Sequence, residues 1–306
     1  MKTIQDILTS GTAYLEARGV EGARHSMQSL LVHVLGCSKT WLYLHHDDPL
    51  TEAQLAPLRE LLRERGKGVP LQHLLGSTEF YRREFRTDAR ALIPRPETEE
   101  LVEFALSMVK PTPGMRVLDM GCGSGIIGIT LALELAKHSP EVVMADISEP
   151  ALALTLENAA SLGAKVRTYR SNLFEAWQNP GDNPVVPPAP FHLVLANLPY
   201  VPDGEAVSAE VSHDPSTALY GGPDGLDIVR RFLEDARPYL AEDCLVMLEV
   251  GHDQGEATRA IMQELGYRDT AVLTDMSGKP RFPYGYATVA FAPQEPEEAA
   301  PDSTEE

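Results

Sequence analysis

The sequence is poor in cysteine and lacks any long apolar run. Its three cysteines, Cys37, Cys122 and Cys244, are spaced too widely for a metal-ligand motif and are odd in number for a disulfide framework. No apolar stretch approaches the roughly 18 residues that a membrane-spanning helix needs. Charged residues also interrupt positions 1–17, which is not the pattern of a secretory signal peptide. These absences predict a cytoplasmic chain that needs neither a membrane nor a metal ion.

Basic residues are scarce as well. The 306 residues contain 26 Lys and Arg against 45 Asp and Glu, which gives a net charge of −19. Residues 1–86 are close to neutral at +1, whereas residues 87–306 carry −20, and six of their acids lie in the tail at 293–306. An acidic region of this size repels a phosphate backbone, so we expect no direct nucleic-acid substrate.

The first 75 residues have the periodicity and stop signals of a small all-α domain. Thr3 with Asp6, and Thr51 with Gln54, have the spacing of capping boxes at helix starts. Gly36 follows a stretch of helical periodicity and is a good helix stop. Four basic residues close to the end of this domain are interpreted as a solvated face rather than a binding site: Arg59, Arg63, Arg65 and Lys67.

After a predicted hairpin linker, β-like runs alternate with helical stretches. The expected strands are 116–120, 142–146, 166–170, 192–196, 244–250 and 288–292, and the expected helices are 126–136, 151–162 and 226–240. Such alternation predicts a mostly parallel sheet that is covered on both faces. Residues 178–190 contain five prolines and predict an exposed loop. The expected domains are 1–75 (helical), 76–93 (linker), 94–292 (α/β) and 293–306 (a disordered acidic tail).

The segment from Asp119 to Gly125 places three alternating glycines between a predicted buried strand and a predicted helix. Gly121, Gly123 and Gly125 allow a sharp turn and let a ligand approach the backbone closely. Asp146 ends the next predicted strand, where a carboxylate can accept hydrogen bonds from both hydroxyls of a ribose. Together these residues predict a site for an adenosine-containing cofactor.

Two details favour S-adenosyl-L-methionine as that cofactor. The spacing is G-x-G-x-G rather than the G-x-G-x-x-G that seats a pyrophosphate on a helix amino terminus. Asp119 would repel a pyrophosphate, whereas it suits the cationic amino group of a methionine moiety. Cys122, inside the loop, has no histidine near it in sequence and is interpreted as a small packing residue rather than a nucleophile.

Asn197-Leu198-Pro199-Tyr200 follows the predicted strand at 192–196, and ligands of doubly wound sheets bind beyond the carboxyl ends of strands. The Asn197 side-chain oxygen and the Leu198 carbonyl could each accept an N–H of a planar, weakly nucleophilic nitrogen, such as an amide or an exocyclic amine. Pro199 biases Leu198 toward an extended conformation, and Tyr200 offers an aromatic face to a flat group. The tetrapeptide therefore predicts methyl transfer to nitrogen by positioning, without a metal or a strong base.

These motifs closely resemble those of the HemK/PrmC family, protein-(glutamine-amide) methyltransferases that act on bacterial release factors. The likeness covers about residues 20–290 and includes G-S-T-E-F-Y at 76–81, L-I-P-R-P-E-T-E at 92–99, A-L-Y-G-G-P-D-G-L at 218–226 and L-E-V-G at 248–251. It implies a Rossmann-like, seven-stranded class I methyltransferase domain, preceded by a small all-α domain that helps to dock the protein substrate. The implied substrate is the glutamine of the Gly-Gly-Gln tripeptide in class I peptide-chain release factors.

The resemblance also assigns roles to residues. The implied clamp on the target glutamine is Asn197, Leu198, Pro199 and Tyr200. The implied S-adenosyl-L-methionine contacts are Asp119, Gly121, Cys122, Gly123, Ser124, Gly125, Asp146, Asn172, Leu173 and Asn197. Two of these positions depart from the family pattern, because Leu198 stands where proline is usual and Asn172 where aspartate is common. Both keep a hydrogen-bond acceptor, although the neutral amide at 172 is expected to bind an adenine amino group less tightly.

Three other interpretations stay open on the sequence. The Asn-Leu-Pro-Tyr form also resembles ribosomal-RNA adenine dimethylases, but the acidic catalytic region argues against an RNA backbone as partner. A sister enzyme that methylates a glutamine of a ribosomal protein would carry the same motifs. A non-catalytic, methyltransferase-like module predicts a damaged glycine loop or a missing Asn197, and neither is seen.

Overall fold

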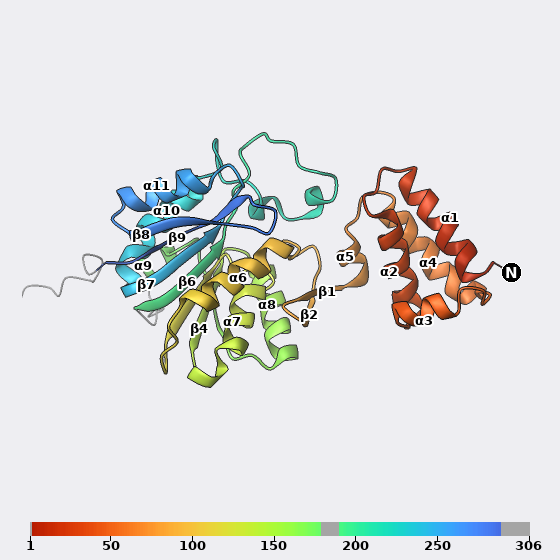
Figure 1. Cartoon of the computed structure of the whole chain (residues 1–306), viewed down its shortest axis with the longest axis horizontal. Helices are drawn as coiled ribbons and strands as arrows, with labels where there is room; N and C mark the ends of the chain where they lie inside the picture. The colour runs from red at the N-terminus through yellow and green to blue at the C-terminus, as the bar shows by residue number, and fades with distance from the viewer. Residues whose placement is uncertain (1, 179–189, 289–306) are drawn as a thin grey trace, which may run out of the picture. The chain divides into compact units, whose positions relative to one another are not determined.

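The chain forms two compact units in the computed structural model, which describes residues 2–178 and 190–288 (Figure 1). The first unit holds residues 1–94 together with 204–219, and the second holds residues 95–203 and the chain from 220 onward. The predicted loop at 178–190, the predicted strand at 288–292 and the acidic tail lie wholly or almost wholly outside the described residues. No helix within 2–178 or 190–288 is long and apolar enough to cross a membrane.

Short amphipathic helices build the first unit. They are α1 (Ile4–Glu16), α2 (Ala23–Leu35), α3 (Lys39–Leu44), α4 (Glu52–Arg65) and α5 (Leu71–Leu75). The predicted capping box starts α1, where the Asp6 N–H donates to Thr3 Oγ1 at 3.2 Å and the Thr3 N–H donates to Asp6 Oδ2 at 2.9 Å. Helix α2 ends as predicted at Gly36, whose φ of 60° lies in the left-handed region. Leu15 and Leu30 are fully buried in the core that these helices share.

The sequence predicts that four basic residues form a solvated face, and this prediction is wrong for Arg65. Arg59, Arg63 and Lys67 form ion pairs with neighbouring glutamates on the surface. Arg65 is only 3% exposed, and its guanidinium donates to Ser26 Oγ at 3.2 Å and to the Val69 carbonyl at 3.1 Å. It also donates to Glu210 Oε1 at 2.5 Å, which connects α4 to the segment 204–219. A sequence pattern cannot reveal this, because the partner lies 145 residues away.

The hairpin predicted for the linker joins β1 (Ser77–Phe80) to β2 (Arg83–Arg86) in antiparallel register. Its two turn residues, Tyr81 and Arg82, have φ values of 49° and 62°. Two-residue turns of this kind favour Asn and Gly, because other residues are strained at positive φ. Phe80 and Phe85 are buried and meet edge to face, with ring centroids 6.0 Å apart.

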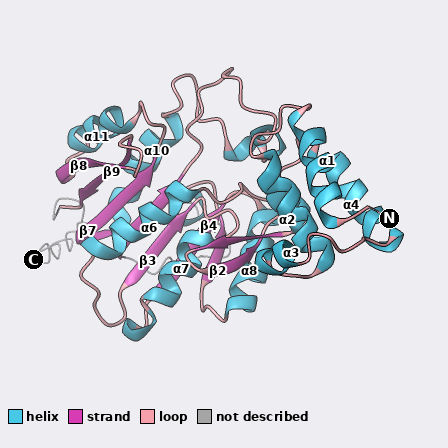
Figure 2. Ribbon diagram, turned by 45° about the vertical axis from the view of Figure 1, so that its right-hand side comes forward, coloured by secondary structure: helices cyan, strands magenta, loops and turns pink. Residues whose placement is uncertain are grey.

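A seven-stranded sheet forms the centre of the second unit, in the order β5-β4-β3-β6-β7-β9-β8 (Figure 2). Its strands are β3 (Arg116–Met120), β4 (Glu141–Asp146), β5 (Arg167–Arg170), β6 (Phe191–Asn197), β7 (Leu240–Glu249), β8 (Arg268–Thr274) and β9 (Pro280–Tyr286). The first five pair in parallel, and β9 pairs antiparallel with both β7 and β8. The predicted seven-stranded, mostly parallel α/β fold is thereby confirmed. The sequence pattern predicts five of these strands, β3 to β7, and does not predict β8 and β9.

Helices cover this sheet and connect its strands. They are α6 (Pro96–Met108), α7 (Ile126–Glu134), α8 (Glu149–Leu162), α9 (Glu175–Gln178), α10 (Asp227–Ala236) and α11 (Gly255–Glu264). Successive strands run outward from β3 in one direction, to β4 and β5, and from β6 in the other direction, to β7. Crossovers between parallel strands are right-handed, so α7 and α8 lie on the opposite face from α10. The strand order therefore reverses between β3 and β6, which is where doubly wound sheets bind ligands.

Candidate active site

The two predicted motifs meet where the strand order reverses. Strands β3 and β6 are direct neighbours, with Met120 opposite Ala196, so the glycine loop and Asn197 leave the sheet side by side. A Cβ added to Gly121 would lie 2.9 Å from Leu198 Cδ2 and 3.6 Å from the Asn197 carbonyl oxygen. The structure thus brings the predicted cofactor loop into contact with the predicted acceptor motif.

The glycine loop has the backbone that its sequence predicts. Gly121, Gly123 and Gly125 all have positive φ, at 72°, 55° and 87°. Two side chains of α8 hold the loop from behind: Thr155 Oγ1 donates to the Gly123 carbonyl at 2.9 Å, and Asn158 Nδ2 donates to the Ser124 carbonyl at 2.9 Å. These two bonds fix the backbone of the loop against α8.

The two side chains within the loop point into the protein. Cys122 is 5% exposed, and its Sγ lies 3.7 Å from Thr155 Oγ1. Burial raises the pKa of the Cys122 thiol well above its usual value, so the thiolate needed for nucleophilic attack is disfavoured. Ser124 is 3% exposed, and its hydroxyl has no hydrogen-bond partner among the described residues. Any cofactor contact from these two residues would come through the backbone.

Asp119 lies beneath the loop with no exposed surface. Its Oδ2 accepts a hydrogen bond from the Gly128 N–H at 2.8 Å, whereas its Oδ1 has no partner in the described part of the chain. Burial raises the pKa of this carboxyl to about 7, and the hydrogen bond from Gly128 opposes that rise. A buried carboxyl with an unsatisfied oxygen is costly in isolation, and a cationic group bound above the loop would offset that cost. This observation fits the residues to the methionine end of S-adenosyl-L-methionine.

Asp146 stands at the end of β4, next to the loop. Its Oδ2 accepts from the Gly123 N–H at 2.9 Å, and its Oδ1 accepts from the Ser148 N–H at 2.8 Å. Burial raises the pKa of Asp146, while these backbone donors lower it. The Ile147 N–H also hydrogen-bonds to this carboxyl. A carboxylate has about four acceptor positions, so it can still accept from a ribose hydroxyl.

Asn172 and Leu173 follow β5, the next strand along. Asn172 Nδ2 donates to Glu175 Oε1 at 3.0 Å, so its side-chain oxygen is turned away from that bond and can accept from an adenine amino group. Leu173 is 6% exposed and has a φ of 52°, a conformation that costs a leucine free energy and occurs often at functional sites. Both lie on the same edge of the sheet as Asp146, because the Ser171 N–H donates to the Asp146 carbonyl at 3.0 Å.

The backbone of the acceptor motif is held by the segment 220–225. The Gly221 N–H donates to the Val201 carbonyl at 2.9 Å. A Cβ on Gly221 would lie 2.4 Å from the Pro199 carbonyl oxygen, and one on Gly225 would lie 2.1 Å from the Tyr200 carbonyl oxygen. Only glycine permits such close approach. The Tyr200 carbonyl also accepts from Gln254 Nε2 at 2.8 Å.

Two buried side chains lie beside Asn197. Glu249 ends β7 directly opposite Asn197 and is 2% exposed, and Thr98 of α6 is 1% exposed. Thr98 Oγ1 donates to Glu249 Oε2 at 2.8 Å, and Asn197 Nδ2 donates to Thr98 Oγ1 at 3.5 Å. Burial raises the pKa of Glu249 to about 7 and that of Tyr200 to about 12, so the phenol stays protonated near neutral pH.

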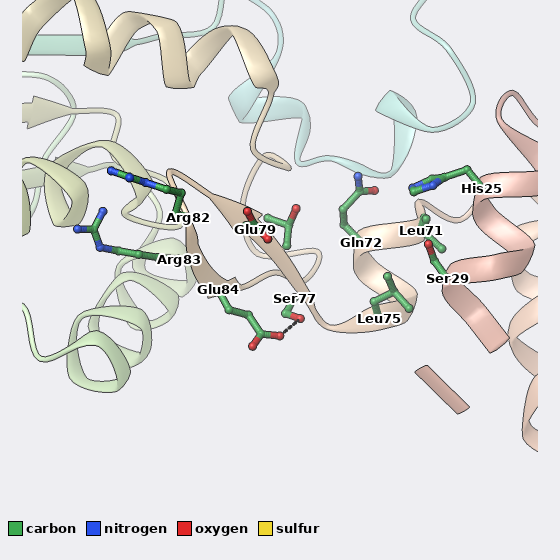
Figure 3. Close-up of a pocket in the computed structure, with 11 residues that line it drawn as sticks. His25, Ser29, Leu71, Gln72, Leu75, Ser77, Glu79, Arg82, Arg83 and Glu84 are labelled. Carbon is green, nitrogen blue, oxygen red and sulfur yellow. Dashed lines mark hydrogen bonds between the residues drawn. The ribbon is translucent and has the colours of Figure 1, made fainter. Parts of the chain in front are cut away.

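A separate pocket lies in the first unit, between α2, α5 and the hairpin (Figure 3). Glu79, Arg82 and Arg83 contribute charged side chains to its wall, and Ser77 Oγ donates to Glu84 Oε1 at 2.6 Å. None of the predicted site residues lines it. We assign it no part in the chemistry.

Comparison with known proteins agrees with this geometry. The model of the PrmC N-terminal domain matches residues 6–76, and that of the methyltransferase small domain matches residues 101–201. The release factor glutamine methyltransferase of Geobacter sulfurreducens is 37% identical over 279 residues, which covers 90% of this chain and 94% of that protein. Those of Bordetella pertussis and Deinococcus radiodurans are 35% and 34% identical and are covered over 100% and 96% of their lengths.

This chain belongs to the release factor glutamine methyltransferase family. Membership confirms the predicted enzyme class, a methyltransferase, and the resemblance on which it rested. The contacts of Thr98, Glu249, Gln254, Thr155 and Asn158 were not predicted from the sequence. Thr98 and Glu249 lie in two of the segments that carry the family resemblance, and that position was the only signal that could have drawn attention to them.

Proposed function

We propose that this member of the release factor glutamine methyltransferase family methylates the side-chain amide nitrogen of the glutamine in the Gly-Gly-Gln motif of class I peptide-chain release factors, with S-adenosyl-L-methionine as donor. The observation that carries this proposal is the contact between the glycine loop at Gly121 and the acceptor motif at Leu198. A reaction between two ligands needs their binding sites to adjoin, and the contact between the two motifs is consistent with that requirement. Family membership supports the protein substrate.

The residues of the chain would act by binding and orientation. Gly121 to Gly125 and Asp146 would hold the cofactor, with Asp119 supplying negative charge beneath its cationic end. The bound cofactor would supply an electrophilic methyl group, whose carbon–sulfur bond breaks with the electron pair on sulfur as the nitrogen–carbon bond forms. Asn197 Oδ1 and the Leu198 carbonyl would each accept one N–H of the target amide, which turns the nitrogen lone pair toward the methyl group.

The amide nitrogen is a weak nucleophile, so its orientation matters more than proton abstraction. Once the new bond forms, the nitrogen becomes strongly acidic and loses its extra proton to water. Tyr200, protonated near neutral pH, would stack on the planar amide rather than act as a base. The enzyme therefore needs no general base among the residues described. With release factors as substrate, we place the reaction in the cytoplasm.

The test is methyl transfer from labelled S-adenosyl-L-methionine to purified release factors, ribosomal proteins and ribosomal RNA in parallel, followed by peptide mass mapping. We expect label on the glutamine of the Gly-Gly-Gln tripeptide and none on a release factor whose glutamine is replaced by glutamate. Label only on a ribosomal-protein glutamine or on an adenine amino group would overturn the substrate and leave the chemistry standing.

A further inference from the structure

Asn197 can serve the reaction only if the correct end of its amide faces the target. Its oxygen and its NH2 group have nearly the same shape, so packing alone does not select between the two orientations. An NH2 group that faced the target would repel the substrate N–H groups. Some neighbouring group must therefore fix the orientation by hydrogen bonding.

We propose, on the basis of the function above, that Thr98 and Glu249 are positioning residues that keep the Asn197 side-chain oxygen turned toward the target amide. A carboxylate can only accept hydrogen bonds, so Glu249 takes the single hydroxyl proton of Thr98, at 2.8 Å. Thr98 Oγ1 then has only lone pairs left for Asn197. The Asn197 NH2 group must turn to it and to the Glu249 carboxylate, with which Asn197 also hydrogen-bonds directly, and the oxygen is left on the opposite side.

The surroundings of Glu249 support a role in the reaction rather than in stability. An ionised carboxylate that is 2% exposed costs free energy, and Arg281, the cation whose charge favours its ionised form, already binds Asp275 at 2.9 Å. The other titratable groups that face Glu249 are Glu97 of α6, which opposes ionisation, and Tyr200. The Asn197–Thr98 distance of 3.5 Å is long for a hydrogen bond, and such contacts tighten when a substrate binds.

Protonation of Glu249 would reverse the direction of the hydrogen bonds that link Glu249, Thr98 and Asn197. A neutral carboxylic acid can donate to Thr98, which frees the Thr98 hydroxyl proton to donate to the Asn197 oxygen. That bond would hold the oxygen away from the target. Because burial raises the pKa of Glu249 to about 7, the change should occur close to neutral pH, with activity falling as the pH is lowered.

The experiment compares Thr98→Val, Thr98→Ser and Glu249→Gln with the wild-type enzyme on a release factor. Thr98→Val keeps the shape and removes the hydroxyl, so we expect kcat to fall about 10- to 100-fold while cofactor affinity stays within about twofold. Thr98→Ser restores the hydroxyl and should recover most of kcat. Glu249→Gln should lower kcat and abolish the loss of activity between about pH 8 and pH 6.

A second readout needs no turnover. The side-chain NH2 resonances of Asn197, assigned by their loss in Asn197→Ala, should exchange slowly with solvent in the wild type and in Thr98→Ser, and faster in Thr98→Val. Unchanged kcat or unchanged exchange in Thr98→Val would overturn the positioning role, as would an acid limb that persists in Glu249→Gln. A wild-type enzyme that shows protected Asn197 resonances but no transfer to release factors would instead refute the proposed function.

Discussion

The acceptor motif requires glycine at position 225, because the neighbouring backbone leaves no room for a side chain there. An added Cβ would lie 2.1 Å from the Tyr200 carbonyl oxygen and 2.5 Å from Gln254 Nε2. Gly225→Ala should therefore displace the motif, lower kcat by more than tenfold and lower the thermal midpoint. Gly204→Ala is the matched control, because Gly204 has a similar φ of 83° with nothing within 4 Å. That control should lose only about 1–2 kcal/mol of stability from its backbone conformation, and equal losses in both variants would contradict the steric argument.

Asn197 and Asp146 separate the two halves of the proposed site. Asn197→Ala removes an acceptor for the target amide and should lower kcat at least about 100-fold while leaving cofactor affinity largely intact. Asp146→Ala removes the carboxylate that would accept from the ribose and should weaken cofactor binding first. Calorimetric titration with S-adenosyl-L-methionine distinguishes them. A parallel loss of affinity in Asn197→Ala would reassign that residue to the cofactor.

Single residues that belong to compact sequence motifs can be predicted from the sequence. The glycine loop, Asp146 and the tetrapeptide are recognisable because each follows a strand at a fixed spacing. Thr98 is different, because it acts on Asn197 across 99 residues and on Glu249 across 151. No local pattern encodes such a contact, and only the strand order brings it about.

At the scale of elements, Arg65 joins α4 to the segment 204–219. Its side chain is 4% exposed, so Glu210→Gln, which keeps an acceptor oxygen but removes the negative charge, leaves a buried cation without its counter-charge and should raise amide hydrogen exchange across 204–219. Arg65→Met should lower the free energy of unfolding of the first unit by roughly 2–4 kcal/mol. Arg59→Met, which loses a surface pair with Glu52, should cost less than about 1 kcal/mol. Chemical denaturation measures both, and equal effects would show that the burial of Arg65 is unimportant.

Two of the elements that the sequence pattern misses, β9 and α11, have a weak local signal. Strand β9 contains Pro280, Pro283 and Gly285, which argue against a strand, yet it lies between β7 and β8. Gln254 precedes the first residue of α11, and its side chain donates to the Tyr200 carbonyl instead of capping the helix. In both places contacts distant in sequence override local preference. Strands β3, β4 and β6 were predicted because they are buried on both faces and read as continuous apolar runs.

At the scale of the whole molecule, buried carboxyl groups make stability depend on pH. Burial raises the pKa of Asp119 to about 7 from 3.8, so its contribution to stability is complete below about pH 4 and is lost as the pH rises toward 7. Asp119→Asn removes this titration and keeps an acceptor for Gly128. Between pH 5 and pH 8 the wild type should lose about 2–3 kcal/mol more unfolding free energy than Asp119→Asn. Urea titrations at the two pH values test this, and parallel losses would contradict it.

The first unit combines two stretches of the chain that are far apart in sequence, which affects how the unit folds during synthesis. Residues 1–94 emerge from the ribosome long before residues 204–219, which complete the same unit. Until then Arg65 lacks Glu210, its partner 145 residues later. We therefore expect the nascent helical unit to remain incompletely consolidated until about residue 219 has left the exit tunnel, by which point strands β3 to β6 have already been synthesised. We expect a fragment cut at residue 94 to lack part of the first unit, and the two units to complete folding together rather than one after the other.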